Sequence, residues 1–157
     1  MLNPFSSVTE VIQPKVLTAA PWLALPGAQD RLEVWSKAAG LDLVRLGTTA
    51  TAEEITDTSV TQPLVVAAAL LAYEEIESRG LLGADVIAAG HSVGELAAAA
   101  VAGVISADDA VALAALRGAE MAKACALEPT GMSAVLGGDE AEVLARIEEL
   151  GLEESGV

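Results

Sequence analysis

One stretch in the middle of this 157-residue chain constrains its fold more than any other. It begins with a run of valine, isoleucine and alanine, passes through Ser92 between Gly90 and Gly94, and continues as an alanine-rich run. Short apolar runs bounded by turn residues are typical of buried strands, and alanine favours helix. We therefore predict a buried strand over residues 85–90, a tight turn, and a helix over residues 92–104.

The remaining chain shows mostly helical patterns. Thr51 with Glu54 and Ser106 with Asp109 have the spacing of helix-start signals, and Gly40 is suited to ending a helix. Pro63 fits the first turn of a long helix, where a missing N–H is tolerated. Helices are predicted over residues 29–39, from 51, over 59–79, 106–126 and 139–151, and extended segments over 8–12, 41–46 and 132–136. Alternating strands and helices predict an α/β fold with a parallel sheet.

Composition and charge exclude several classes of function. Hydrophobic residues make up 53% of the chain, which is enough to form a buried core. The net charge is −15 and the sequence has no basic cluster, which argues against nucleic-acid binding. An anionic substrate would need one or two locally placed cations. Cys125 is the only cysteine, so neither a disulfide nor a cysteine metal site is expected. The longest apolar run, residues 64–72, is about half a membrane span, and we expect a cytoplasmic protein.

The Gly90-x-Ser92-x-Gly94 turn has the form of a nucleophile elbow, in which a serine hydroxyl projects from a strained turn. Glycine at both flanks provides the room that such a turn requires. The first N–H groups of the following helix could stabilise an oxyanion. His91 is the only histidine, but neighbouring side chains in such a turn point apart, so we do not expect it to be the general base for Ser92.

The motif Gly90-His91-Ser92-Val93-Gly94-Glu95 resembles the signature of the malonyl-CoA:acyl-carrier-protein transacylases and of the related acyltransferase domains of polyketide synthases. Thr61-Gln62-Pro63 precedes it, and Leu116-Arg117-Gly118 with Met121 follows it, at spacings that are similar to those of the family. Gly131-Met132 resembles the family's entry into a small subdomain.

The resemblance implies an α/β-hydrolase-like parallel sheet with helices, present in part, and the first strand and helix of a ferredoxin-like small subdomain. The expected domains are a divergent N-terminal segment over residues 1–20, a partial large domain over 21–127 and the truncated start of the small subdomain over 128–157.

The implied activity is that of an acyl-carrier-protein S-malonyltransferase of fatty-acid biosynthesis. Ser92 would accept malonyl from malonyl-CoA and pass it to acyl carrier protein, with the Val93 N–H in the oxyanion hole. Arg117 would hold the free carboxylate of malonate, because its planar fork suits a carboxylate. Gln62 and His91 would complete the substrate-binding residues. No cofactor and no metal are expected beside malonyl-CoA and acyl carrier protein.

Two departures from the family pattern shape the expectation for this chain. Residues 1–20 lack the family's Gly-Gln-Gly-x-Gln loop, and the family's catalytic histidine would lie beyond Val157. We therefore expect a fragment with impaired activity. Three alternatives stay open: a polyketide synthase acyltransferase fragment, a non-catalytic remnant that binds acyl carrier protein or coenzyme A, and a serine hydrolase, which Gln62 and Arg117 disfavour.

Overall fold

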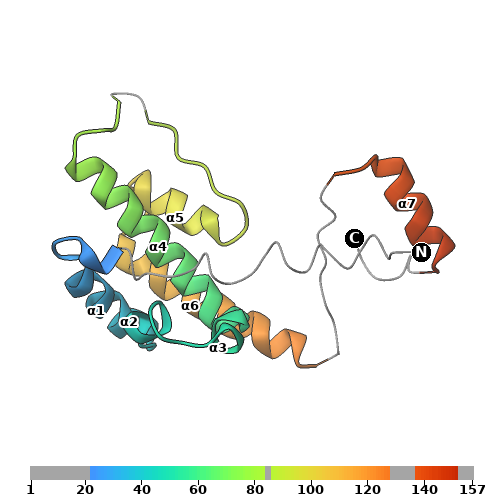
Figure 1. Ribbon diagram of the computed structural model, residues 1–157, viewed down its shortest axis with the longest axis horizontal. Helices are drawn as coiled ribbons and strands as arrows, with labels where there is room; N and C mark the ends of the chain where they lie inside the picture. The colour runs from blue at the N-terminus through green and yellow to red at the C-terminus, as the bar shows by residue number, and fades with distance from the viewer. Residues whose placement is uncertain (1–21, 84–85, 128–136, 152–157) are drawn as a thin grey trace. The chain divides into compact units, whose positions relative to one another are not determined.

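The computed structural model describes residues 22–83, 86–127 and 137–151. The chain divides into two compact units, residues 13–129 and residues 1–12 with 130–157. The described part of the first unit contains η3 (Trp22–Ala24), α1 (Ala28–Ala39), α2 (Leu43–Leu46), α3 (Ala52–Thr56), α4 (Thr58–Ser78), α5 (Gly94–Val101) and α6 (Ala107–Cys125) (Figure 1). The second unit contains α7 (Glu140–Glu149). The predicted domain boundaries stay a prediction.

The prediction of a parallel sheet is wrong for the described residues, which form helices, turns and irregular segments but no strand. Residues 86–90, predicted to be a buried strand, are irregular, and Ile87 is 93% exposed. A strand exists only through hydrogen bonds to a neighbouring strand, and the described residues offer this segment none. Residues 8–12 and 132–136 lie outside the described part.

The extended segment predicted at residues 41–46 is also wrong, because residues 43–46 form the short helix α2. The side chain of Asp42 accepts a hydrogen bond from the Arg45 N–H (2.9 Å), which is a helix N-cap that the weak alternation of apolar residues concealed. Local capping therefore outweighed the apparent period of two.

Several helix-end signals are confirmed. Thr51 and Glu54 form a complete capping box at the start of α3, and the Ser106 hydroxyl accepts from the Asp109 N–H (3.0 Å) at the start of α6. Gly40 ends α1 in the left-handed conformation, with φ of 67°. Pro63 lies in the second turn of α4 rather than in its first, because α4 begins at Thr58.

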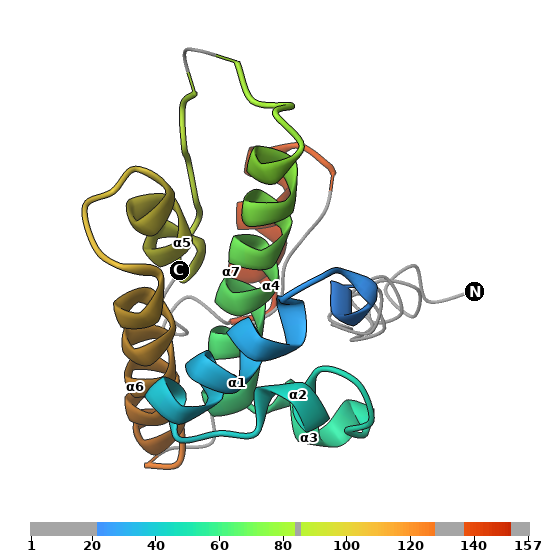
Figure 2. The ribbon, with the colours of Figure 1, turned by 90° about the vertical axis from the view of Figure 1, so that its left-hand side faces the viewer.

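The core of the first unit forms around α4, which packs against α1, α5 and α6. Figure 2 shows α1 lying across α4 and α6. The helices contribute apolar side chains to one cluster, in which Trp35 is the largest fully buried side chain. The cluster includes Leu32 and Trp35 from α1, Leu43 from α2, Val66, Ala67 and Leu70 from α4, Ala97 from α5, and Ala110, Val111 and Ala114 from α6.

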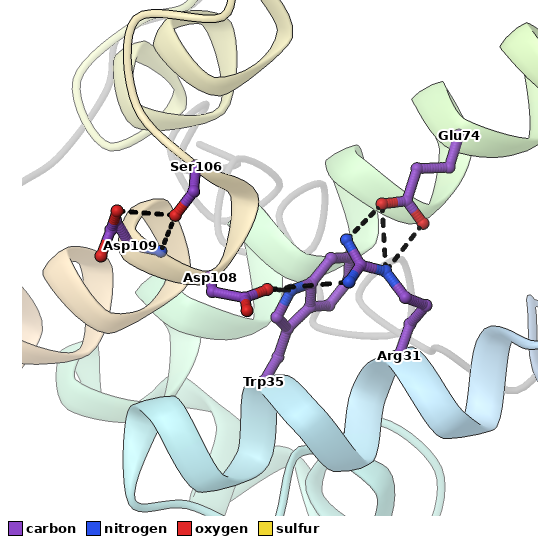
Figure 3. Close-up of polar contacts among 6 residues, drawn as sticks. All are labelled: Arg31, Trp35, Glu74, Ser106, Asp108 and Asp109. Atoms are coloured by element: carbon purple, nitrogen blue, oxygen red, sulfur yellow. Dashed lines mark hydrogen bonds and ion pairs between the residues drawn. The ribbon is translucent and has the colours of Figure 1, made fainter.

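A polar network joins α1, α4 and α6 at one edge of this core (Figure 3). Arg31 of α1 donates to both carboxylate oxygens of Glu74 of α4, at 2.6 to 3.2 Å, and its guanidinium lies 4.6 Å from the centre of the Trp35 ring. The Trp35 Nε1–H donates to Asp108 of α6 (3.0 Å). The hydrogen bond to Glu74 raises the pKa of Arg31. One buried indole and one guanidinium of α1 thus connect it to both α4 and α6.

We predict that Trp35→Phe lowers the free energy of unfolding by about 1–3 kcal/mol, because it removes the donor to Asp108 and some buried area. Urea denaturation followed by circular dichroism measures this change. The hydrogen-bonding share is isolated by repeating Trp35→Phe in an Asp108→Ala background, where the cost should be smaller. Equal costs in the two backgrounds would contradict the proposed coupling of α1 to α6.

Candidate active site

The turn before α5 holds Ser92 in a strained conformation. Ser92 has φ of 55° and is the one non-glycine residue with positive φ in the part of the chain that the structure describes. A serine in the left-handed region is disfavoured and indicates a conformation imposed by its surroundings. The turn is closed by hydrogen bonds from the Gly94 N–H to the His91 carbonyl (2.9 Å) and from the Glu95 N–H to the Ser92 carbonyl (3.1 Å).

The two glycines of the motif have different physical roles. A Cβ atom added at Gly90 would lie 2.1 Å from the carbonyl oxygen of Gly94, so this position must lack a side chain. A Cβ atom added at Gly94 would meet nothing within 4 Å. The sequence reasoning assigned both glycines to relief of crowding, and in the described structure only Gly90 has that role.

Ser92, Arg117 and Gln62 come together from three separate segments of the chain. The Arg117 Nη2 donates to Ser92 Oγ at 3.0 Å, and its Nη1 donates to Gln62 Oε1 at 2.5 Å. Ser92 belongs to the turn before α5, Arg117 to α6 and Gln62 to α4. The structure therefore places a serine hydroxyl and a guanidinium within hydrogen-bonding distance of each other.

Gln62 is the buried member of this group, with 5% of its surface exposed. Its Nε2 donates to Thr58 Oγ1 (2.7 Å), one turn earlier on α4, and to Met121 Sδ (3.2 Å) on α6. Sequence reasoning gave no role to Thr58 and none to Met121 beyond the family resemblance. Thr58 lies four residues before Gln62, and Met121 lies four residues after Arg117. Residues four apart in a helix lie on the same face, so this spacing is the signal that could have identified both residues.

The remaining predicted site residues lie on the same turn. The Val93 N–H donates no hydrogen bond to any described residue. His91 is exposed, and its side chain makes no hydrogen bond with the described residues. The described structure therefore shows no hydrogen bond between His91 and the Ser92 hydroxyl.

The described residues contain no group of three or more histidine, cysteine or acidic side chains that could hold a metal ion. Within the same residues, no helix has the length and apolar character that crossing a membrane requires.

We predict that Gly90→Ala disrupts this turn and that Gly94→Ala does not. The added methyl group at residue 90 would force the backbone of Gly94 away, at a cost of about 1–3 kcal/mol. At residue 94, alanine should be neutral or favourable because it is a better helix former. Urea denaturation, together with the amide resonances of residues 91–95, measures both effects. Similar losses in the two variants would refute the assignment.

Comparison with known proteins identifies the family. The profile described as "Acyl transferase domain" matches residues 15–150. The chain is 76% identical over 132 residues to the malonyl CoA-acyl carrier protein transacylase of Mycolicibacterium smegmatis, covering 84% of this chain and 46% of the relative. The protein of the same name from Escherichia coli (strain K12) is 38% identical over 114 residues, covering 73% of this chain and 37% of the relative.

A solved structure agrees with these matches. The crystal structure of MCAT from Mycobacterium tuberculosis superposes with a TM-score of 0.77 at 72% sequence identity, covering 85% of this chain and 44% of that chain. The chain thus spans about half the length of the curated relatives it matches. Because the family profile covers most of its residues, this chain belongs to the acyl transferase domain family.

Proposed function

We propose that this chain accepts a malonyl group from malonyl-CoA on Ser92 and transfers it to acyl carrier protein, in fatty-acid biosynthesis. The observation that carries the proposal is the 3.0 Å contact between Arg117 Nη2 and Ser92 Oγ. The carboxylate of a malonyl group is one methylene away from its thioester carbonyl. A cation beside the nucleophile is therefore well placed to hold that carboxylate while the carbonyl is attacked. Relatives 73–76% identical to this chain are named malonyl CoA-acyl carrier protein transacylases.

The proposed reaction has two acyl-transfer steps. Ser92 Oγ attacks the thioester carbonyl, the Val93 N–H stabilises the oxyanion, and the C–S bond breaks to release coenzyme A as its thiol. The thiol of acyl carrier protein then attacks the Ser92 ester and regenerates the hydroxyl. Arg117 has five N–H donors, so it can bind a carboxylate while keeping its contact with Gln62. We propose no cofactor for either step.

The proposed acylation should be slow in this chain. Within the described residues, the group that contacts Ser92 Oγ is a guanidinium, which donates hydrogen bonds and cannot accept a proton. A serine hydroxyl without a base is a weak nucleophile at neutral pH. The same observation favours a second candidate, a non-catalytic module that binds the malonyl thioester without forming the ester. A cytoplasmic location agrees with either candidate, since the chain has one cysteine.

We predict that incubation with malonyl-CoA produces one malonyl adduct, detected by intact-mass analysis, and that Ser92→Ala abolishes it. The rate of adduct formation should be orders of magnitude below ordinary enzyme turnover, because none of the described residues that contact Ser92 Oγ is a base. Circular dichroism of both proteins controls for folding. If the folded chain binds malonyl-CoA saturably but forms no adduct, the transferase proposal is wrong and the non-catalytic binding module is the better description.

We predict that Arg117→Ala lowers the rate constant for malonyl adduct formation by about 10- to 150-fold, the effect of losing a charged hydrogen-bond pair. Acetyl-CoA lacks the free carboxylate, so its slower reaction should change much less. Arg45→Ala is the matched control, since Arg45 pairs with Glu54 (2.9 Å) away from Ser92. The protein is incubated with malonyl-CoA and acetyl-CoA in competition, and mass spectrometry measures the ratio of malonyl to acetyl adduct. An unchanged ratio in Arg117→Ala would exclude Arg117 as the carboxylate-binding residue.

A further inference from the structure

The side chain of Gln62 is held at both ends of its amide. Nε2 donates to Thr58 Oγ1 (2.7 Å) and to Met121 Sδ (3.2 Å), while Oε1 accepts from Arg117 Nη1 (2.5 Å). The side chain is buried, so water does not compete strongly for these contacts. The Nε2 end of the amide therefore faces two hydrogen-bond acceptors, and the Oε1 end faces a donor.

The orientation of this amide controls whether Arg117 is attracted or repelled. A guanidinium only donates hydrogen bonds, so an amide rotated by half a turn would place Nε2 donors against Nη1 donors. The last torsion of a glutamine side chain is broad and nearly two-fold, and it does not select one orientation by itself. The thioether of Met121 can accept but not donate, and the Thr58 hydroxyl holds Nε2 one helical turn away.

Thr58 reaches this position because α4 and α6 touch backbone to backbone. A Cβ atom added at Gly118 would lie 2.5 Å from the carbonyl oxygen of Thr58, so the absence of a side chain on Gly118 permits the contact. Gly118 directly follows Arg117, and Met121 lies one turn further along α6. The neighbouring hydroxyl of Ser59 donates instead to Asp57, so it does not compete with Thr58 for Gln62.

We propose that Thr58 is a positioning residue of the acyl-binding site. Through the amide of Gln62, Thr58 fixes Nη1 of Arg117, and the planar guanidinium then directs Nη2 to Ser92 Oγ and to the free carboxylate of the acyl group. The carboxylate part of this role rests on the malonyl chemistry proposed above. The positioning of Gln62 and Arg117 does not depend on it.

The first arm of the test observes the two side chains directly by ¹⁵N nuclear magnetic resonance of the whole 157-residue chain. The chain has three glutamines, one asparagine and five arginines, so the side-chain signals are few, and Gln62→Met and Arg117→Lys assign them. In Thr58→Val, the Gln62 amide protons should exchange with solvent at least about tenfold faster than in the wild type. The Arg117 Nε signal should shift. Thr58→Ser, which keeps the hydroxyl, should restore both.

Thr61→Val is the matched control. Thr61 lies beside Gln62 on α4, but its hydroxyl donates to the Ile55 carbonyl and not to the amide. Loss of that hydroxyl should leave the Gln62 and Arg117 signals in place. The backbone amide spectrum of each variant shows whether it is folded. Unchanged Gln62 exchange and an unchanged Arg117 signal in folded Thr58→Val would overturn the proposal.

The second arm measures malonyl adduct formation against malonyl-CoA concentration. Thr58→Val should raise the half-saturating concentration by about tenfold, with little change for acetyl-CoA, and Thr58→Ser should stay near the wild type. If no protein forms an adduct while Thr58→Val still alters the Gln62 and Arg117 signals, the transferase function fails and the positioning role stands. If Thr58→Val alters the Gln62 and Arg117 signals but leaves adduct formation unchanged, the link from Thr58 to carboxylate binding is refuted.

Discussion

The close crossing of α4 and α6 at Gly118 is the contact on which the rest of the site depends. With a side chain at residue 118, the first turn of α4 could not approach α6, since even a methyl group would lie 2.5 Å from the Thr58 carbonyl oxygen. This approach sets the separation of Gln62 and Arg117, whose side chains meet at 2.5 Å. The network of Arg31 and Trp35 holds α1 against the same two helices from the other edge of the core.

The second constraint is the strained turn at Ser92. Its positive φ and the missing side chain at Gly90 let the turn fold back so that the serine hydroxyl reaches Arg117, 25 residues later in the chain. Local strain of this kind persists only when surrounding contacts over-determine it. The turn and the helix crossing therefore act together, because each positions one partner of the contact between hydroxyl and guanidinium.

Predictions from sequence succeeded where the signal was local. The capping box of Thr51 and Glu54, the cap at Ser106 and the stop at Gly40 each depend on residues within one turn of each other. The parallel sheet was wrong because a strand needs a partner that local sequence does not specify. Residues 86–90 have the composition of a strand, but they have no neighbouring strand among the described residues.

The sequence by itself determined the chemical types at the site, the family and the positions of most helix ends. The serine between two glycines, the arginine and the glutamine could all be read from their order in the chain. Only the tertiary structure decided which of these side chains touch, and that Thr58 and Met121 hold the Gln62 amide. The physical reason is that hydrogen-bond geometry between helices depends on how closely their backbones pack, and that distance comes from contacts between residues far apart in sequence.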